Sequence, residues 1–203
     1  MTASNKKKSS RSYILFYKPF GVLSQFTSDT KHRSLSDFGP FPKDVYAAGR
    51  LDADSEGLLF LTNDNDINHQ LTDPKFEHER TYLVQVEGIP DECDIEKLRC
   101  GVVIEGKRTK PANVSLCNHE PNLPKRVVPI RFRKNVPTAW LKMTLREGRN
   151  RQVRKMTAAV GHPTLRLVRT SITFLSIKGL KPGENRILNP VEIKKLLDLL
   201  MPI

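Results

Sequence analysis

The chain has 203 residues, enough for one large domain or two small domains that share a sheet. Hydrophobic residues make up 38% and charged residues 28%, as in ordinary globular proteins, and no apolar run is long enough to span a bilayer. Lys and Arg total 34 against 22 Asp and Glu, which gives a formal net charge of +12. A field of this sign attracts polyanions, so nucleic acid is the expected partner and a membrane is not.

Basic residues are concentrated in one part of the chain. They are Arg126, Arg131, Arg133, Lys134, Arg146, Arg149, Arg151, Arg154, Lys155, Arg166 and Arg169. Arginine outnumbers lysine there, which suits bidentate contacts with phosphate. The alternative is that these side chains are only a solvated basic surface.

The ends of the chain and its cysteines indicate a cytoplasmic protein. Residues 1–11 are rich in Ser and Lys and are predicted to be a disordered basic tail. The tail has no apolar segment of the kind found in export signals. Cys93, Cys100 and Cys117 are too widely spaced for a metal clip and are expected to be unpaired thiols in a reducing cytosol.

The first half of the chain predicts mainly strands. Apolar or alternating runs place them at Tyr13–Tyr17, Val45–Ala48, Gly57–Thr62 and Thr81–Glu87. The run GLLFLT at 57–62 has the continuous apolar character of a buried strand. A turn at 63–66 precedes a short helix that extends toward Leu71.

The second half predicts helices and further strands without regular alternation. Helices are predicted over Asp91–Cys100, over Arg149–Val160, and from an N-cap at Asn189 onward. Strands are predicted at Val102–Ile104, Asn113–Leu116, Ala139–Leu145 and Leu165–Val168. Because strands and helices are mixed without βαβ repeats, the predicted class is α+β, with a largely antiparallel mixed sheet and flanking helices.

Several common chemistries leave no motif in this sequence. It contains no GxxxxGK[ST], no GxGxxG after a strand, no HExxH and no CxxC. The five histidines, His32, His69, His78, His119 and His162, are predicted to be surface or turn residues. We therefore expect no metal, nucleotide or redox cofactor.

An acidic loop between two apolar strands is the strongest candidate for a catalytic site. The segment AGRLDADSEGLLFLT at 48–62 holds Asp52, Asp54, Ser55 and Glu56. Rigid flanking strands would fix the position of a carboxylate there. The alternative is a solvated acidic turn. If the loop is extended, Asp52 and Asp54 point to opposite sides and do not form a glycosidase-like acid–base pair.

The predicted helix over 149–160 offers a partner for this loop. Val153, Met156 and Val160 recur at helical spacing and are expected to face the core. Arg154 is rotated by about 100° from Val153 and would lie at the edge of that face. It is placed to pair with a buried aspartate and keep it ionised, or alternatively to contact phosphate.

The acidic loop, as GRLDADSEGLL, resembles the signature of the RsuA family of RNA pseudouridine synthases. Other stretches resemble the family's motifs in the same order, namely YKPFGVLS, RTYLVQVEG, EGRNRQVRKM, GHPTLRLVR and LKPGENRIL. Asn185 stands where an aromatic residue is common in the family. The segments VYAAGRLD and YLVQVEGIP resemble the E-type branch, whose members lack the family's auxiliary N-terminal RNA-binding domain. We expect that domain to be absent here as well.

The resemblance implies a cofactor-independent isomerase that converts one uridine of large-subunit (23S) ribosomal RNA to pseudouridine. It makes residues 12–203 the catalytic domain, with Asp52 as nucleophile or base, Tyr82 stacking on the uracil and Arg154 paired with the carboxylate. Val153 would form an apolar wall. The further residues expected to bind substrate are Arg50, Arg149, Arg151, Lys155 and Arg169. A monomer acting on RNA before full ribosome assembly is expected.

Other functions remain open from sequence alone. The same chemistry could serve another structured RNA, such as small-subunit ribosomal RNA or transfer RNA. The charge alone also allows a non-catalytic RNA-binding or ribosome-assembly protein. A nucleoside hydrolase-like enzyme using Asp52 with water is a further alternative, although no second well-placed general base is evident.

Overall fold

The computed structural model describes residues 10–130 and 136–201. Its strands are β1 (Tyr13–Lys18), β2 (Tyr46–Ala47), β3 (Glu56–Thr62), β4 (Arg80–Glu87), β5 (Val103–Ile104), β6 (Lys107–Arg108), β7 (Asn113–Leu116), β8 (Thr138–Leu145), β9 (Thr164–Ile172), β10 (Leu175–Ser176) and β11 (Asn185–Ile187). Its helices are α1 (Asn65–Thr72), α2 (Glu92–Cys100), α3 (Gln152–Ala159) and α4 (Pro190–Leu200), with 3-10 turns at Leu35–Phe38 and Pro74–Phe76.

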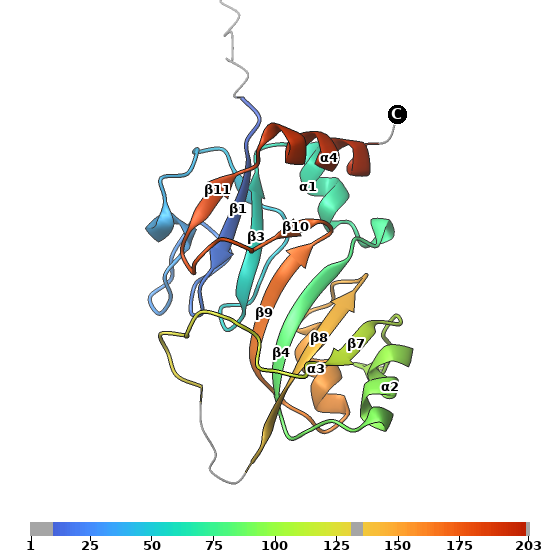
Figure 1. Ribbon diagram of the computed structural model, residues 1–203. Coiled ribbons are helices and arrows are strands. Elements are labelled where there is room, and N and C mark those ends of the chain that lie inside the picture. The colour runs from blue at the N-terminus through green and yellow to red at the C-terminus, as the bar shows by residue number, and fades with distance from the viewer. Residues whose placement is uncertain (1–9, 131–135, 202–203) are drawn as a thin grey trace, which may run out of the picture.

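One twisted mixed sheet organises the described residues. Its main path runs β11-β1-β3-β9-β4-β8-β7, with β2 on β3 and β10 on β9, while β5 and β6 form a separate hairpin. Along this path every pairing is antiparallel except that of β3 with β9. Helices α1 and α4 cover the half of the sheet around β1 and β3, and α2 and α3 lie at the other half (Figure 1). The predicted α+β class with a largely antiparallel sheet is confirmed.

The central strands are buried on both faces. Leu15 of β1 packs into the core under α1 and α4, while its neighbour Phe16 packs on the opposite face against Leu35 and Val45. This explains the continuous apolar run of β3, every residue of which is buried. A third cluster packs Val153 and Met156 of α3 against β4 and β8, so the predicted core face of that helix is confirmed.

Most predicted elements are present, and three differences bear on the site. Helix α3 begins at Gln152, not at 149, because Arg151 adopts a left-handed conformation with φ 50°. Strand β9 extends to Ile172, beyond the predicted end at Val168, because Arg169 is buried within it. The short strands β6, β10 and β11 are additional to the predicted ones, since two or three residues carry no periodic pattern.

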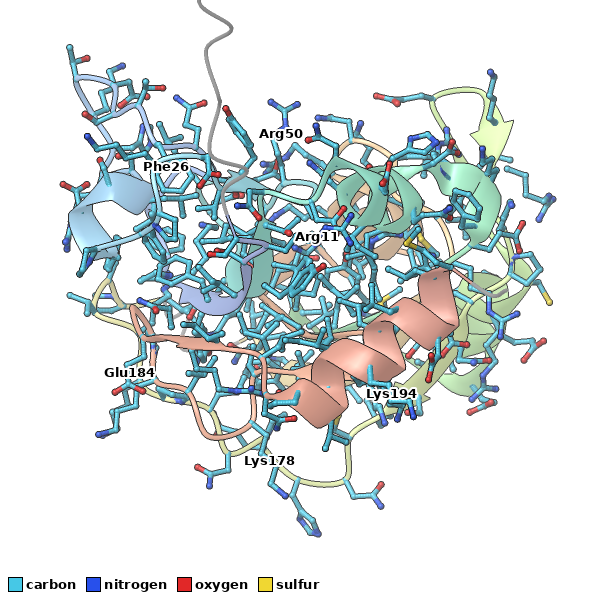
Figure 2. The ribbon with its side chains drawn as sticks, turned by 90° about the horizontal axis from the view of Figure 1, so that it is seen from above. Arg11, Phe26, Arg50, Lys178, Glu184 and Lys194 are labelled. Carbon is cyan, nitrogen blue, oxygen red and sulfur yellow. The ribbon has the colours of Figure 1, made fainter. Side chains whose placement is uncertain are left out.

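The tail and the basic stretch are partly outside the described residues. Residues 1–9 of the predicted tail lie there, as do Arg131, Arg133 and Lys134. Arg11 is held by an ion pair with Asp64, with Nε 3.2 Å from Oδ2. Figure 2 shows Arg11 at the entry to the folded part and Lys194 on α4, which crosses the near side of the molecule.

The two halves of the sheet meet at the parallel junction between β3 and β9. Only two residue pairs form it, Glu56 with Val168 and Gly57 with Arg169. Gly57 has a φ of +109°, and a Cβ atom there would clash with the backbone of Arg169 at its nitrogen and its carbonyl group. Position 57 therefore requires glycine for two reasons, its backbone conformation and the close approach of β9.

We predict that Gly57→Ala destabilises the fold far more than a change at another positive-φ glycine. Gly106→Ala is the matched control, because Gly106 has a φ of +76° and an added methyl group would meet no atom within 4 Å. The control should lose about 1 kcal/mol from backbone strain, and Gly57→Ala at least about 3 kcal/mol because of the added clash. Urea unfolding measures both. Equal losses would mean that the close approach contributes nothing.

Candidate active site

A cleft of about 310 Å³ opens beside the acidic loop. Its walls come from the loop before β3, from Tyr82 on β4, from the end of β8 with the turn that follows, and from the start of α3. Of the residues predicted from sequence, the cleft is lined by Arg50, Asp52, Tyr82, Arg149, Arg151 and Val153. Arg50 is exposed and lies at the outer surface (Figure 2). Arg154, Lys155 and Arg169 do not line this cleft.

The acidic loop is fixed by the segment that follows β1. Lys18, fully buried, donates from Nζ to the carbonyl oxygens of Val22 (2.6 Å) and Ala53 (3.5 Å). Ser24 Oγ donates to the Leu51 carbonyl oxygen at 2.7 Å and accepts from the Leu51 backbone N–H at 2.9 Å. The YKPFGVLS motif therefore holds both sides of Asp52 in place. Lys18 and Ser24 are not among the predicted site residues, although they fall in a motif that the sequence identifies.

Burial changes the protonation of Lys18. It lowers the pKa of the Lys18 ammonium to about 7, against the attraction of the carboxylates of Glu56, Asp54 and Asp52, which favours the charged form. The side chain is thus poised to change its charge near neutral pH. It lies beneath a loop whose own charge comes from carboxylates.

Arg151 bridges the two aspartates of the loop. Its Nη2 lies 2.7 Å from Asp54 Oδ2, and its Nη1 lies 3.1 Å from Asp54 Oδ1 and 3.4 Å from Asp52 Oδ2. Asp52 and Asp54 would point to opposite sides only in an extended loop; the loop turns here instead, and both carboxylates reach Arg151. Arg151 is an ion-pair partner of this loop and is not free to serve only as a phosphate contact.

Asp54 is the more strongly held of the two carboxylates. Burial alone would raise the pKa of Asp54, but the hydrogen bond from Arg151 and the charges of Arg154 and Arg151 outweigh it and lower the pKa. The side chains of Asp52 and Asp54 are both 37% exposed, but Asp52 has only the longer contact to Arg151. Among the described residues, Asp52 is therefore the loop carboxylate with oxygen atoms still open to a substrate.

Arg154 reaches the loop but does not pair with Asp52 as expected. Its Nη2 donates to the carbonyl oxygen of Asp54 at 2.7 Å and lies 3.5 Å from both Ser55 Oγ and Asp54 Oδ1. The later start of α3 places Arg151, not Arg154, nearest to Asp52. Burial lowers the pKa of Arg154, and the Asp54 charge opposes that shift. Arg154 thus positions the loop backbone.

The buried ion pair expected in this region is formed by other residues. Arg166 Nε and Nη2 contact the two carboxylate oxygens of Glu56 at 2.9 and 2.8 Å, and both side chains are more than nine-tenths buried. Arg166 also donates to the carbonyl oxygen of Pro124, which ties the proline-rich loop to the sheet. A member of the predicted phosphate-binding stretch is therefore structural.

Two further predicted substrate residues are engaged with the β5–β6 hairpin. Lys155 Nζ lies 2.7 Å from Glu105 Oε1, and Arg149 donates to the carbonyl oxygens of Ile104 (2.8 Å) and Lys107 (3.2 Å). These bonds attach the start of α3 to the hairpin. Arg149 keeps a face on the cleft, whereas Lys155 is placed outside it.

His162 lies in the turn before β9, and its side chain is mostly buried. The His162 side chain is 14% exposed, with Nδ1 2.8 Å from the Glu87 carbonyl oxygen and Nε2 3.1 Å from Asp94 Oδ2. It connects the turn before β9 to the end of β4 and to α2. Within the described ranges, no three His, Cys, Asp or Glu side chains gather as a metal site. Nor does any helix described here have the length and apolar character to cross a membrane.

Comparison with known proteins identifies related chains. A family model described as RNA pseudouridylate synthase matches residues 12–159. "Ribosomal large subunit pseudouridine synthase E" of Vibrio parahaemolyticus is 52% identical over 174 residues, covering 86% of this chain and 72% of the relative. "Ribosomal large subunit pseudouridine synthase B" of Bacillus subtilis is 38% identical over 185 residues, covering 91% of this chain and 70% of the relative. A pseudouridylate synthase crystal structure, 29% identical, superposes with a TM-score of 0.75 over 92% of this chain and 74% of that one.

We predict that Arg151→Gln raises the pKa of Asp54 to its ordinary value or above, because burial then acts without its main opposing hydrogen bond. The native pKa lies below the ordinary one, so Asp54 stabilises the fold above about pH 4, and this contribution is lost as pH falls. The variant should lose less stability over that acidic range. Carboxyl ¹³C NMR titration measures the pKa.

Arg149→Gln is the control for this measurement. Arg149 contacts carbonyl groups of the β5–β6 hairpin, so its replacement should leave the pKa of Asp54 in place. If both variants moved the Asp54 pKa equally, the shift would come from the general basic field and not from the Arg151 hydrogen bonds.

Proposed function

The chain belongs to the RNA pseudouridylate synthase family, and on that premise we propose that it converts one specific uridine of large-subunit ribosomal RNA to pseudouridine. Relatives from Vibrio and Xanthomonas that share 52% of their aligned residues with it carry the name ribosomal large subunit pseudouridine synthase E. The residues matched by the family model, 12–159, include every lining residue of the cleft except Leu167.

The observation that carries the catalytic proposal is the position of Asp52 in the cleft. Its carboxylate lines the cavity together with Tyr82, and its one close contact is Arg151 Nη1 at 3.4 Å. Asp54 is instead saturated by Arg151 and Arg154. Asp52 therefore combines a cationic neighbour with a position on the wall of the space where a base would bind.

The reaction breaks the N1–C1′ glycosidic bond, turns the uracil, and forms a C5–C1′ bond. The proton on C5 is released and N1 gains a proton, so the product is an isomer of the substrate. The reaction is redox-neutral, so no outside electrons are needed. An ionised Asp52 starts the cleavage, either as a nucleophile or as a base, and both roles require the deprotonated carboxylate. Arg151 supplies the positive charge beside it.

Tyr82 and Val153 shape the space for the base. Tyr82 is half-buried in the cleft on β4, where its ring can stack on a uracil, and Val153 forms an apolar wall from the first turn of α3. A uridine in structured RNA must leave its stack before it enters, which costs a few kcal/mol. Contacts between RNA phosphates and exposed arginines, Arg50 among them, offset that cost.

Arg154 acts on this machinery through the loop backbone. Its hydrogen bond to the Asp54 carbonyl oxygen fixes the residue two positions after Asp52. Lys18 holds the Ala53 carbonyl oxygen from the other side. The carboxylate of Asp52 is thus carried on a backbone that is anchored at the carbonyl groups of the two residues that follow it.

We predict that Asp52→Asn abolishes isomerisation and leaves RNA affinity within about threefold of the parent, because the amide keeps the shape but cannot act as nucleophile or base. The matched control is Asp54→Asn, which removes the neighbouring carboxylate and should keep activity within about tenfold of the parent. Tritium release from large-subunit RNA labelled at uridine C5 is the assay. Turnover by Asp52→Asn above about 1% of the parent rate would rule out the assignment.

The second test concerns the RNA. We propose that the enzyme acts as a monomer in the cytoplasm. Its proposed substrate is large-subunit RNA that is not yet fully assembled, because single-stranded bases are easier to extrude and read than a closed A-form helix. Protein-free large-subunit RNA should be modified at one uridine, and intact ribosomes, small-subunit RNA and transfer RNA should be poor substrates. Efficient modification of transfer RNA would overturn the proposed target and leave the chemistry standing.

A further inference from the structure

A second, smaller cavity of about 180 Å³ adjoins the catalytic cleft. It shares Arg50, Tyr82, Gly148 and Arg149 with the cleft and extends from there toward Arg80 and Arg169. A water molecule occupies about 30 Å³ of liquid, so this space is large enough for a polyatomic group. Four arginines line it, and none of its lining residues is an aspartate or a glutamate.

Arg169 is the deepest of these arginines. It is 3% exposed, and its Nε donates to the Leu58 carbonyl oxygen at 2.8 Å. Its Nη2 is buried and has no hydrogen-bond partner in the described part of the chain. A buried donor without an acceptor is destabilising, and a charged one more so. The group is therefore arranged for an acceptor that the described residues do not supply.

Among the residues that the structure describes, no carboxylate forms an ion pair with the other arginines of this cavity, although the charge of Arg149 acts on Glu105 outside it. Arg80 donates to the carbonyl oxygens of Leu71 (2.8 Å) and His78 (3.3 Å), and burial lowers its pKa, with the charge of Arg169 adding to the effect. Elsewhere in the fold a buried arginine is neutralised, as Arg166 is by Glu56. This cavity therefore concentrates positive charge that the described side chains do not compensate.

We propose that this cavity binds one phosphodiester group of the RNA, on the nucleotide whose base enters the catalytic cleft or on its immediate neighbour. The inference rests on the proposed function and adds a subsite to it. A phosphate offers several anionic acceptor oxygens, which suit the unpaired Arg169 nitrogen and the adjacent guanidinium groups. Because Tyr82 and Arg50 belong to both spaces, an anchored phosphate and a base beside Asp52 lie within one nucleotide's reach.

Such a subsite has a mechanical role in base extrusion. A phosphate held deep in the fold fixes the backbone at the point about which the target nucleotide rotates. Its binding also neutralises the repulsion among Arg80, Arg149 and Arg169. The favourable free energy of that contact is gained when RNA binds, and it offsets part of the cost of lifting the base out of its stack.

The first probe is inorganic phosphate. Its binding is measured by ³¹P NMR titration of the full chain and of three variants. Arg169→Gln removes the deep charge. Gly148→Val adds a side chain at the cavity wall and keeps every arginine; among the described residues, the one atom that its Cβ would meet within 4 Å is Arg80 Nη1, at 4.0 Å. Arg146→Gln is the control, since Arg146 is exposed, pairs with Glu79 and does not line the cavity.

The parent chain should bind one phosphate saturably. Arg169→Gln and Gly148→Val should each weaken that binding at least about tenfold, while Arg146→Gln should stay within about twofold. Thermal unfolding tests whether each variant is folded. If Arg169→Gln does not fold, the result for Gly148→Val decides whether the cavity binds phosphate. Binding that does not saturate, or that Gly148→Val leaves unchanged in a folded protein, would overturn the subsite.

The RNA arm separates this inference from the proposed function. For large-subunit RNA, Arg169→Gln should reduce the slope of log affinity against log salt by about one phosphate contact. Isomerisation is followed separately by tritium release. Saturable phosphate binding without turnover would overturn the proposed reaction and support the subsite. Turnover by a parent chain that binds no phosphate, with a salt slope unchanged in Arg169→Gln, would overturn the subsite and support the reaction.

Discussion

The close contact between β3 and β9 is the constraint on which the rest of the molecule depends. Two residue pairs join the two halves of the sheet there, in parallel orientation, and Gly57 permits the contact because β9 leaves no room for a side chain. The buried Glu56–Arg166 ion pair connects the same two strands. The acidic loop ends at the first residue of β3, so the position of Asp52 depends on this contact. Arg169, directly opposite Gly57, is brought beneath the cleft by the same two pairs.

Arginine has two distinct uses around this junction. Arg166 and Arg151 pair with carboxylates, which neutralises them and fixes structure. Arg80, Arg149 and Arg169 have only backbone carbonyl groups as partners among the described residues, so their charge is oriented but not cancelled. In the sequence, four of these five arginines belong to the basic stretch, and Arg80 lies upstream of it. Their division into structural and ligand-directed groups depends on which of them the sheet places beside Glu56 and the aspartates.

Much of this arrangement is predictable from residue patterns, and the exceptions have physical causes. Alternating and apolar runs identify β1, β3, β4, β7 and β8, and helical spacing identifies the core face of α3 through Val153 and Met156. The family motifs lead to Asp52 and Tyr82, which do share a cleft. The predicted partner of Asp52 is wrong because the left-handed conformation of Arg151 starts α3 late, and no local pattern indicates it. The predicted β9 is too short because arginines in a sequence indicate an exposed segment. Arg166 and Arg169 are buried in the strand only because Glu56 and the Leu58 carbonyl oxygen accept their hydrogen bonds.

Two aspartates lie two positions apart in one loop, and their surroundings give them different capacities. Asp54 accepts from Arg151 twice and lies near Arg154, so most of its lone pairs are committed and its pKa is lowered. Such a carboxylate is a poor nucleophile, because its electron density is already engaged and its cationic partners would have to be released. Asp52 has a single, longer contact with the same guanidinium. Arg151 therefore contacts both aspartates: Asp54 holds it in place, and from that position it reaches only one oxygen of Asp52, at 3.4 Å. A loop with one aspartate would have to use the same carboxylate to hold the arginine and to meet a ligand in the cleft.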